Sequence, residues 1–287
     1  MNPIQPTFAD SRLYTAAQVR ELDRCAIEDH GIPGIELMER AGKAVFDAIR
    51  GQFLRCTSWL IVCGGGNNGG DGYIIARLAR ECGFECEVFA LKAPGELKGD
   101  AALAAKKWHD SAGITRSGPP ENTRGFDLVV DALLGTGLDR AAAGDYAVAI
   151  RAMNNSELPV VAVDIPSGLN ADTGCAMGGL GVQAQLTVTF IGNKRGLFTA
   201  DGPDHAGMIH YVSLDVPGKV FDTKINSGEL IRENIIEQYL PRRPRNSHKG
   251  HSVGTKPIPS AIQQPSSIAT GIVHMSWKPG IRLAALS

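Results

Sequence analysis

Residues 59–73 are Trp59-Leu60-Ile61-Val62-Cys63-Gly64-Gly65-Gly66-Asn67-Asn68-Gly69-Gly70-Asp71-Gly72-Tyr73, and this stretch decides the fold. The apolar run at 59–62 predicts a buried strand, and the run from Tyr73 to Ala79 predicts a helix. Glycines between a strand and a helix let the backbone approach a ligand closely. The free N–H groups at the start of the helix favour an anion. The stretch therefore predicts an anion-binding turn in an α/β protein.

Three polar side chains make this turn unusual, namely Asn67, Asn68 and Asp71. A turn that only cradles phosphate rarely needs two carboxamides and a carboxylate together. We therefore expect it to hold something besides phosphate, such as a cation or a ribose.

The composition is that of a globular protein. The chain has 287 residues, enough for one large domain or two smaller ones, with 43% hydrophobic and 21% charged residues. A net charge of −1 gives no reason to expect nucleic acid or an anionic membrane as a partner. No apolar stretch approaches the length of a membrane span, and the six cysteines contain no Cys-x-x-Cys pair. We expect reduced thiols in a cytoplasmic protein.

Two helices are expected near the start of the chain. Thr15 followed by Gln18 matches a capping box, and Pro33 suits the first position of a second helix. The apolar residues at helical spacing are Val19, Leu22 and Ala26 in the first helix, and Met38, Ala41, Val45 and Ile49 in the second.

Strand and helix patterns then alternate from residue 59 to residue 215. Short apolar runs such as Val160-Val161-Ala162-Val163 are typical of strands covered on both faces. The alternation predicts a mostly parallel sheet with helices on both sides, whose ligands bind beyond the carboxyl ends of the strands. The expected strands are 59–63, 85–91, 126–132, 158–164, 186–191 and 208–214, and the expected helices are 72–82, 99–112 and 142–155.

Three polar motifs follow strands and should converge on one edge of this sheet. They are Asn67 to Asp71, Asp131-Ala132-Leu133-Leu134-Gly135-Thr136-Gly137-Leu138, and Asp164-Ile165-Pro166-Ser167-Gly168-Leu169. Oxygen ligands without His or Cys suit an alkali or alkaline-earth cation. Each motif alone also has a structural explanation, because a Gly-x-Gly-x-x-Gly match, a strand-end Asp and a Ser are common in turns. Their convergence is what favours a site.

The chain closely resembles the NAD(P)H-hydrate epimerase family, the YjeF N-terminal domain. The resemblance covers roughly residues 13–238. It rests on Leu37-Met38-Glu39-Arg40-Ala41-Gly42, on 66–72, on 131–137 and on Val163-Asp164-Ile165-Pro166-Ser167-Gly168. It implies a Rossmann-like three-layer α/β/α sandwich. It also implies interconversion of the R and S forms of NADHX and NADPHX, nicotinamide cofactors hydrated at C6, with one potassium ion per subunit.

The resemblance also implies roles for individual residues. The hydrated cofactor should contact Asn67, Asn68, Gly69, Gly70, Asp71, Gly135, Thr136, Gly137, Leu138, Asp139, Arg140, Ala141 and Asp164. Potassium should be ligated by Asn68, Asp131 and Ser167. We expect Asp164 to be the acid–base residue, since inversion at C6 needs a proton donor and acceptor. Lys194 resembles a lysine near the family's site, but we expect it to be a solvated surface residue.

The expected domain organisation is a leader over 1–12, an epimerase domain over 13–238, and a basic linker with a poorly ordered tail over 239–287. The segment from Arg242 to Gly250 resembles the join to an ADP-dependent dehydratase in bifunctional repair enzymes. Because a dehydratase-like continuation does not follow, we expect a truncated or frameshifted form that lacks this activity and works with a separate dehydratase. A homodimer is an open option.

Two other functions stay open from the residues alone. A classical NAD-dependent oxidoreductase usually has an acid at the end of its second strand to bind the ribose. Here Leu91-Lys92-Ala93-Pro94 occupies that place, which weighs against this function. A non-catalytic nucleotide-binding module is the other alternative, and the presence of Asp131 and Asp164 favours catalysis over it.

Overall fold

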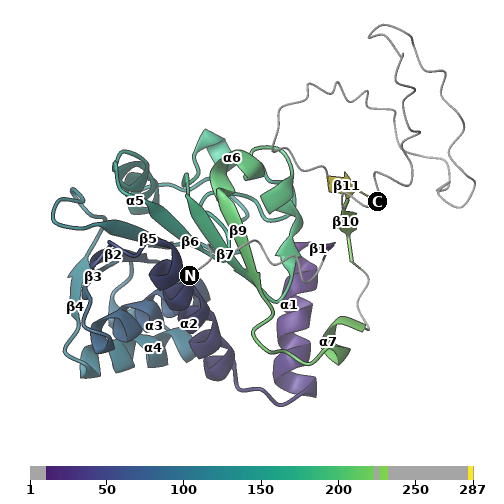
Figure 1. Cartoon of the computed structure of the whole chain (residues 1–287), viewed down its shortest axis with the longest axis horizontal. Coiled ribbons are helices and arrows are strands. Elements are labelled where there is room, and N and C mark those ends of the chain that lie inside the picture. The colour runs from purple at the N-terminus through teal and green to yellow at the C-terminus, as the bar shows by residue number, and fades with distance from the viewer. Residues whose placement is uncertain (1–10, 223–225, 232–283, 287) are drawn as a thin grey trace, which may run out of the picture. The chain divides into compact units, whose positions relative to one another are not determined.

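A computed structural model of the chain describes residues 11–222, 226–231 and 284–286. Its centre is a seven-stranded sheet in the order β4-β3-β2-β5-β6-β7-β9, in which all neighbouring strands are parallel (Figure 1). The strands are β2 (Ser58–Cys63), β3 (Glu85–Ala90), β4 (Ile114–Ser117), β5 (Leu128–Ala132), β6 (Val160–Val163), β7 (Leu186–Phe190) and β9 (Met208–Val212). The predicted parallel α/β architecture is confirmed.

Helices cover both faces of this sheet (Figure 1). One face carries α2 (Gly34–Gln52), α3 (Asn67–Glu81) and α4 (Gly99–Asp110), and the other carries α5 (Asp145–Asn154). Two short helices, α6 (Gly202–Ala206) and α7 (Lys219–Asp222), and 3₁₀ turns at Pro94–Glu96, Met177–Gly179 and Arg195–Phe198 lie in the connections. The three layers are those of the expected sandwich.

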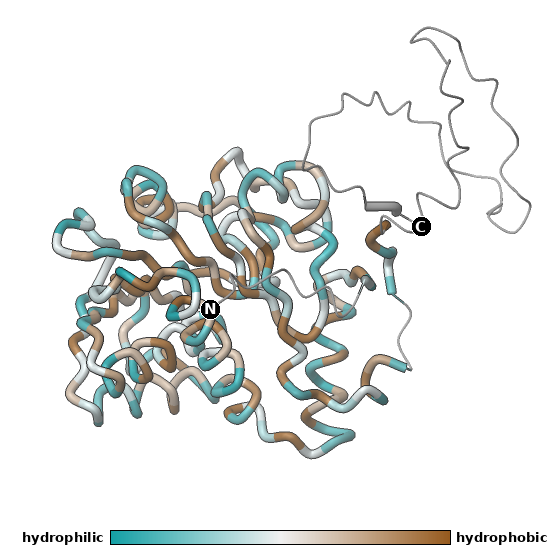
Figure 2. The backbone as a smooth tube through the Cα atoms, viewed as in Figure 1, coloured by the Kyte–Doolittle hydropathy of each residue, from teal (hydrophilic) through white to brown (hydrophobic). Residues whose placement is uncertain are grey.

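Alternate side chains of the central strands build two separate cores. Ile61 and Cys63 of β2 pack with α2, α3 and α4, whereas Leu60 and Val62 pack with α5. This period of two is why the strand is apolar throughout, since both of its faces are covered. The hydrophobic segments of the described chain accordingly gather in the sheet (Figure 2).

The N-terminal helix starts as the capping motif predicts. In α1 (Ala16–Arg24), the Thr15 side chain accepts a hydrogen bond from the Gln18 amide, and the Gln18 side chain accepts one from the Thr15 amide. A π-helical turn at Cys25–Asp29 continues the helix. Pro33 then precedes α2, and the apolar residues predicted for that helix are buried.

A small second sheet, in the order β11-β10-β1-β8, joins distant parts of the chain. Strand β1 (Arg12–Tyr14) runs parallel to β8 (Asn193–Lys194) and antiparallel to β10 (Gly228–Leu230). Strand β11 (Ala284–Leu286) pairs antiparallel with β10. Because Tyr14 pairs with Lys194, this sheet fixes the segment that carries Lys194 relative to α1.

The structure differs from the expectations in the strands of the small second sheet and in two further elements. Helix α3 begins at Asn67 and not near residue 72, so the supposed polar loop is the helix's first turn. Strand β4 was not predicted, because three of its four residues are exposed at the sheet edge. The expected leader (1–12) and the expected linker and tail (239–287) lie outside the described residues, apart from 11–12 and 284–286.

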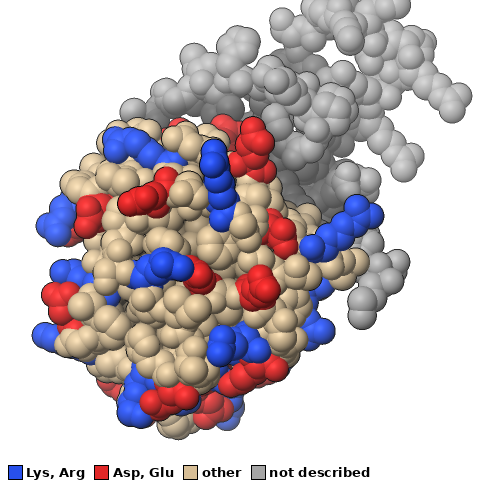
Figure 3. All heavy atoms as spheres, turned by 90° about the vertical axis from the view of Figure 1, so that its left-hand side faces the viewer, with Lys and Arg blue, Asp and Glu red and all other residues tan. Residues whose placement is uncertain are grey.

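The distribution of surface charge and the hydropathy of the helices are relevant to possible binding partners. Acidic and basic side chains are interspersed over the face of the described residues that Figure 3 shows. Among the described helices, none is both long and apolar enough to cross a bilayer.

Candidate active site

A pocket of about 1010 Å³ lies at the carboxyl ends of the central strands. From β2 the chain moves outward to β3 and β4 and then returns to β5 on the other side of β2. The strand order therefore reverses between β2 and β5, which is where open α/β sheets bind their ligands. The segments that follow β2, β5 and β6 all contribute to the pocket wall.

The first turn of α3 forms the floor of the pocket. Asn67, Asn68 and Asp71 line it, whereas Gly69 and Gly70 are buried in the helix. The N-cap, Gly66, has an extended conformation and supplies no side-chain cap. The first N–H groups of the helix are thus open to a ligand, and their partial positive charge favours a phosphate.

The loop after β5 forms the second wall. All seven residues from Gly135 to Ala141, which are expected to contact the cofactor, line the pocket. This loop lies close to the turn after β2, because a Cβ atom at Gly64 would overlap the backbone carbonyl of Leu133. Glycine at position 64 therefore allows the two strand ends to meet.

Beneath this wall, Asp131, Ser167 and Asn68 lie in one hydrogen-bonded cluster. Ser167 donates from its amide to Asp131 Oδ2 (2.8 Å) and from its hydroxyl to Oδ1 (2.6 Å), and Leu133 N also donates to Oδ1 (3.2 Å). Asn68 Nδ2 donates to the Leu134 carbonyl oxygen (3.2 Å). Burial raises the pKa of Asp131 to about 6, although these hydrogen bonds act in the opposite direction.

The chemistry of this cluster fits a monovalent cation. Asp131 is fully buried, and no described cation pairs with its carboxylate. Carboxylate, hydroxyl, amide and carbonyl oxygens are the donors that hard cations prefer. The predicted ligand set of Asn68, Asp131 and Ser167 has only one carboxylate. The cluster therefore suits an ion of low charge.

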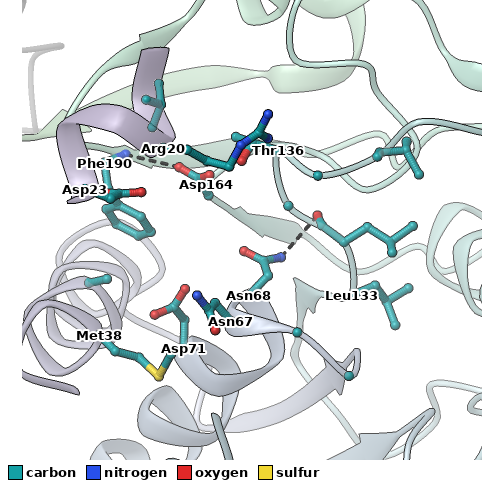
Figure 4. A pocket seen from close by; sticks show the side chains of 18 of the residues that line it. Arg20, Asp23, Met38, Asn67, Asn68, Asp71, Leu133, Thr136, Asp164 and Phe190 are labelled. Atoms are coloured by element: carbon teal, nitrogen blue, oxygen red, sulfur yellow. Dashed lines mark hydrogen bonds between the residues drawn. The ribbon is translucent and has the colours of Figure 1, made fainter. Parts of the chain in front are cut away.

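Asp164 stands at the end of β6 in an unusual conformation. Its φ is +66°, in the left-handed region that Asp and Asn tolerate better than most residues. Its amide donates to Val188 O (2.7 Å), and its Oδ1 accepts from Phe190 N (3.3 Å) and forms an ion pair with Lys194. The side chain points into the pocket (Figure 4). Such strain is common at functional sites.

The expectation for Lys194 was wrong. Its side chain is 1% exposed, and its Nζ donates to Asp164, to Thr189 Oγ1 (3.1 Å) and to Phe190 O (2.9 Å). The short strand β8 holds it there through its pairing with β1. Lys194 is thus a buried partner of the pocket carboxylate and not a solvated residue.

Sequence reasoning missed the contribution of α1. Arg20 and Asp23 line the pocket together with Met38 of α2 and Phe190 at the end of β7 (Figure 4). Burial, with a smaller contribution from Asp164, raises the pKa of Asp23 to about 6. A signal was present, because Asp23 is four residues after Val19 and next to Leu22, on the helix face expected to be buried.

A doubly wound parallel sheet with a polar pocket at its switch point defines a class of α/β protein that binds its ligands beyond the carboxyl ends of the strands. Within that class, the chain belongs to the family described as YjeF-related protein N-terminus, whose model matches residues 34–196.

Named relatives agree with this assignment. The NAD(P)H-hydrate epimerase of Limosilactobacillus fermentum is 41% identical over 201 residues, which are 68% of this chain and 93% of that protein. The bifunctional NAD(P)H-hydrate repair enzyme Nnr of Escherichia coli is 38% identical over 245 residues, covering 85% of this chain and 47% of that enzyme. The chain thus spans about half the length of such bifunctional relatives.

A solved structure supports the fold alone. The crystal structure of yeast ynu0 matches with a TM-score of 0.58 at 20% identity, covering 70% of this chain and 87% of that chain.

Proposed function

We propose that this chain epimerises the R and S forms of NADHX and NADPHX. Family membership and the likeness to a protein named NAD(P)H-hydrate epimerase support this activity. The observation that carries it is the position of Asp164, a half-buried carboxylate that is ion-paired with the buried Lys194 and faces a pocket large enough for a nucleotide. An oxidoreductase or a non-catalytic binding module is less well supported, because neither needs a carboxylate held in this way.

The pocket suits a hydrated dinucleotide. The first turn of α3 offers amides to the pyrophosphate, and the 135–141 loop offers a second set. Asn67, Asn68 and Asp71 would contact the substrate, and their places in the pocket wall support this. Gly69 and Gly70 would act by letting α3 lie close to its neighbours, since the structure buries them.

Asn68, Asp131 and Ser167 would hold the potassium ion. When bound, the ion would offset the buried charge of Asp131 and fix the loops after β5 and β6 relative to α3. The protein's own residues carry out the proton transfer. Asp164 would exchange a proton at the C6 hydroxyl, and Lys194 would keep that carboxylate oriented.

The same proposal implies a coupled enzyme and a cellular location. An S-specific, ADP-dependent dehydratase would consume one epimer, so the chain would be coupled functionally to such an enzyme. Each of the six cysteines is a free thiol, which supports a reducing cytoplasmic location.

The decisive experiment is epimerisation of purified R-NADHX in potassium buffer, coupled to an S-specific dehydratase. We expect NADH to be recovered faster with this chain than with the dehydratase alone. The matched control is Asp110→Asn, which removes an exposed carboxylate on α4 and should leave the rate unchanged. A folded, potassium-loaded protein that gives no acceleration would overturn the proposal.

A further inference from the structure

Three carboxyl groups from three elements share one end of the pocket. Asp23 of α1, Asp71 of α3 and Asp164 after β6 all line it, and their side chains point into the same space (Figure 4). Lys194 is ion-paired with Asp164, so its charge is already engaged. Asp71 is only 9% exposed, and its carboxyl group has no hydrogen-bond partner among the described residues. A buried acid left in this state points to a ligand in the pocket.

Electrostatics oppose the ionisation of all three groups. Burial raises the pKa of Asp71 well above its ordinary value, and the neighbouring Asp164 and Asp23 raise it further. Burial likewise raises the pKa of Asp23 to about 6. Carboxyl groups that share a site in this way keep a proton between them at a pH where isolated groups would lose it.

We propose that Asp23 is a second acid–base residue of this pocket, which together with Asp71 holds the proton that the C6 hydroxyl receives. The proposal rests on the epimerase function proposed above and adds a residue that precedes the span matched by the family model. Asp164 follows β6 and Asp23 lies on α1, and the proposal places the substrate ring between these two carboxyl groups.

Asp23 and Asp164 together account for the protons that move during the epimerisation. Asp23 gives its proton to the C6 hydroxyl, the C6–O bond breaks with its electron pair on oxygen, and water leaves. The N1 lone pair forms an N1=C6 double bond. Water then adds to the opposite face of C6, the π electrons return to N1, and Asp164 takes the released proton. The reverse epimerisation exchanges the two roles, and exchange with solvent resets the protons.

The charged surroundings of Asp23 define the pH dependence. The groups that act on it are Asp164, Asp71 and Lys194, and Arg20 lies one turn earlier on α1 in the same pocket wall. We expect kcat to fall at higher pH as Asp23 loses its proton.

The test is kcat of R-NADHX epimerisation as a function of pH for the full chain and for Asp23→Asn. The variant should lose at least about 100-fold in kcat. The decrease of kcat at higher pH should also disappear in this variant. Its dissociation constant for the substrate should stay within about threefold of that of the unmodified chain. Asp23→Glu keeps a carboxyl group and should recover part of the rate. Asp29→Asn, an exposed change on the same helical segment, should behave like the unmodified chain.

The outcomes separate this proposal from the proposed function. If the unmodified chain gives no acceleration, the epimerase function fails. Suppose instead that the unmodified chain accelerates the reaction. If Asp23→Asn then keeps a kcat within threefold of the unmodified chain, and its kcat still falls at higher pH, the proposed role of Asp23 is wrong. Thermal unfolding of both variants checks folding, and Asp23→Asn should be at least as stable because it removes a like charge from the cluster.

Discussion

At the residue scale, Asp164 combines a strained backbone with an ion pair to the buried Lys194. Asp164→Asn keeps a residue type that tolerates positive φ but removes the negative charge. We expect kcat of epimerisation to fall at least about 100-fold. The free energy of unfolding should also fall, by about 3–5 kcal/mol, because Lys194 is left buried without its partner. Coupled assays and urea unfolding measure the two effects.

A paired substitution distinguishes chemistry from folding. In Asp164→Asn/Lys194→Met both charges are removed, so most of the lost stability should return while the activity does not. Recovery of the rate together with the stability would show that Asp164 has only a structural role.

Asp23 should make stability depend on pH. Its pKa is about 6 in the folded chain, above its ordinary value of 3.8. Below pH 3.8 both states are protonated. As the pH rises from about 4 to about 6, the unfolded state loses this proton first, so the folded state becomes less stable. At about 1.4 kcal/mol per pKa unit, the loss is at most about 3 kcal/mol.

Asp23→Asn should therefore flatten the decline of the unfolding free energy between pH 4 and pH 7. Urea unfolding at several pH values measures it, with Asp29→Asn as the exposed control that keeps the slope. An unchanged slope in Asp23→Asn would mean that burial does not perturb this carboxyl.

The sequence identified the pocket residues that sit in motifs and missed those that depend on tertiary packing. Asn67, Asn68, Asp71 and Asp164 follow strands, so the parallel topology alone brings them together. Lys194 is different, because its burial depends on the pairing of β8 with the distant strand β1. No local pattern around residue 194 encodes that pairing.

At the element scale, helix α3 lies unusually close to the sheet. A Cβ atom at Gly72 would lie 2.6 Å from Cys63 Sγ and 2.7 Å from Ala132 Cβ. Gly72→Ala should therefore destabilise the fold by about 1–3 kcal/mol, although alanine favours a helix by about 1 kcal/mol. Gly95→Ala is the control, since a Cβ atom there meets nothing within 4 Å. Urea unfolding of both variants would contradict the packing argument if Gly72→Ala were neutral.

A comparison of predicted and observed elements shows where local sequence patterns fail to predict the structure. The six predicted strands correspond to β2, β3, β5, β6, β7 and β9. Four of them, β2, β5, β6 and β7, are almost entirely buried runs, which makes them easy to recognise. Strand β4 has no such pattern, and β1, β8 and β10 have only two or three residues each. The first turn of α3 was predicted as a loop because it contains several glycines, which favour a turn when tertiary packing is not considered.

At the scale of the whole molecule, potassium should stabilise the fold. An ion that binds only the folded state raises the midpoint of thermal unfolding by mass action. We expect a higher midpoint in potassium chloride than in choline chloride at equal ionic strength. Asn68→Ala should lessen the difference. A midpoint independent of the cation in the unmodified chain would argue against the Asn68, Asp131 and Ser167 site.

The small sheet allows the segments of the main domain to be connected in a different order. Arg12 pairs with Glu229, and Leu230 N donates to Ser11 O (2.8 Å), so the two ends of the main domain are neighbours. A short glycine linker could join them, with new termini opened in the exposed loop at Glu121–Asn122. Such a circular permutant should fold and keep the pocket intact. Circular dichroism and the epimerase assay would measure this, and a permutant that stays unfolded would show that the native connectivity is required.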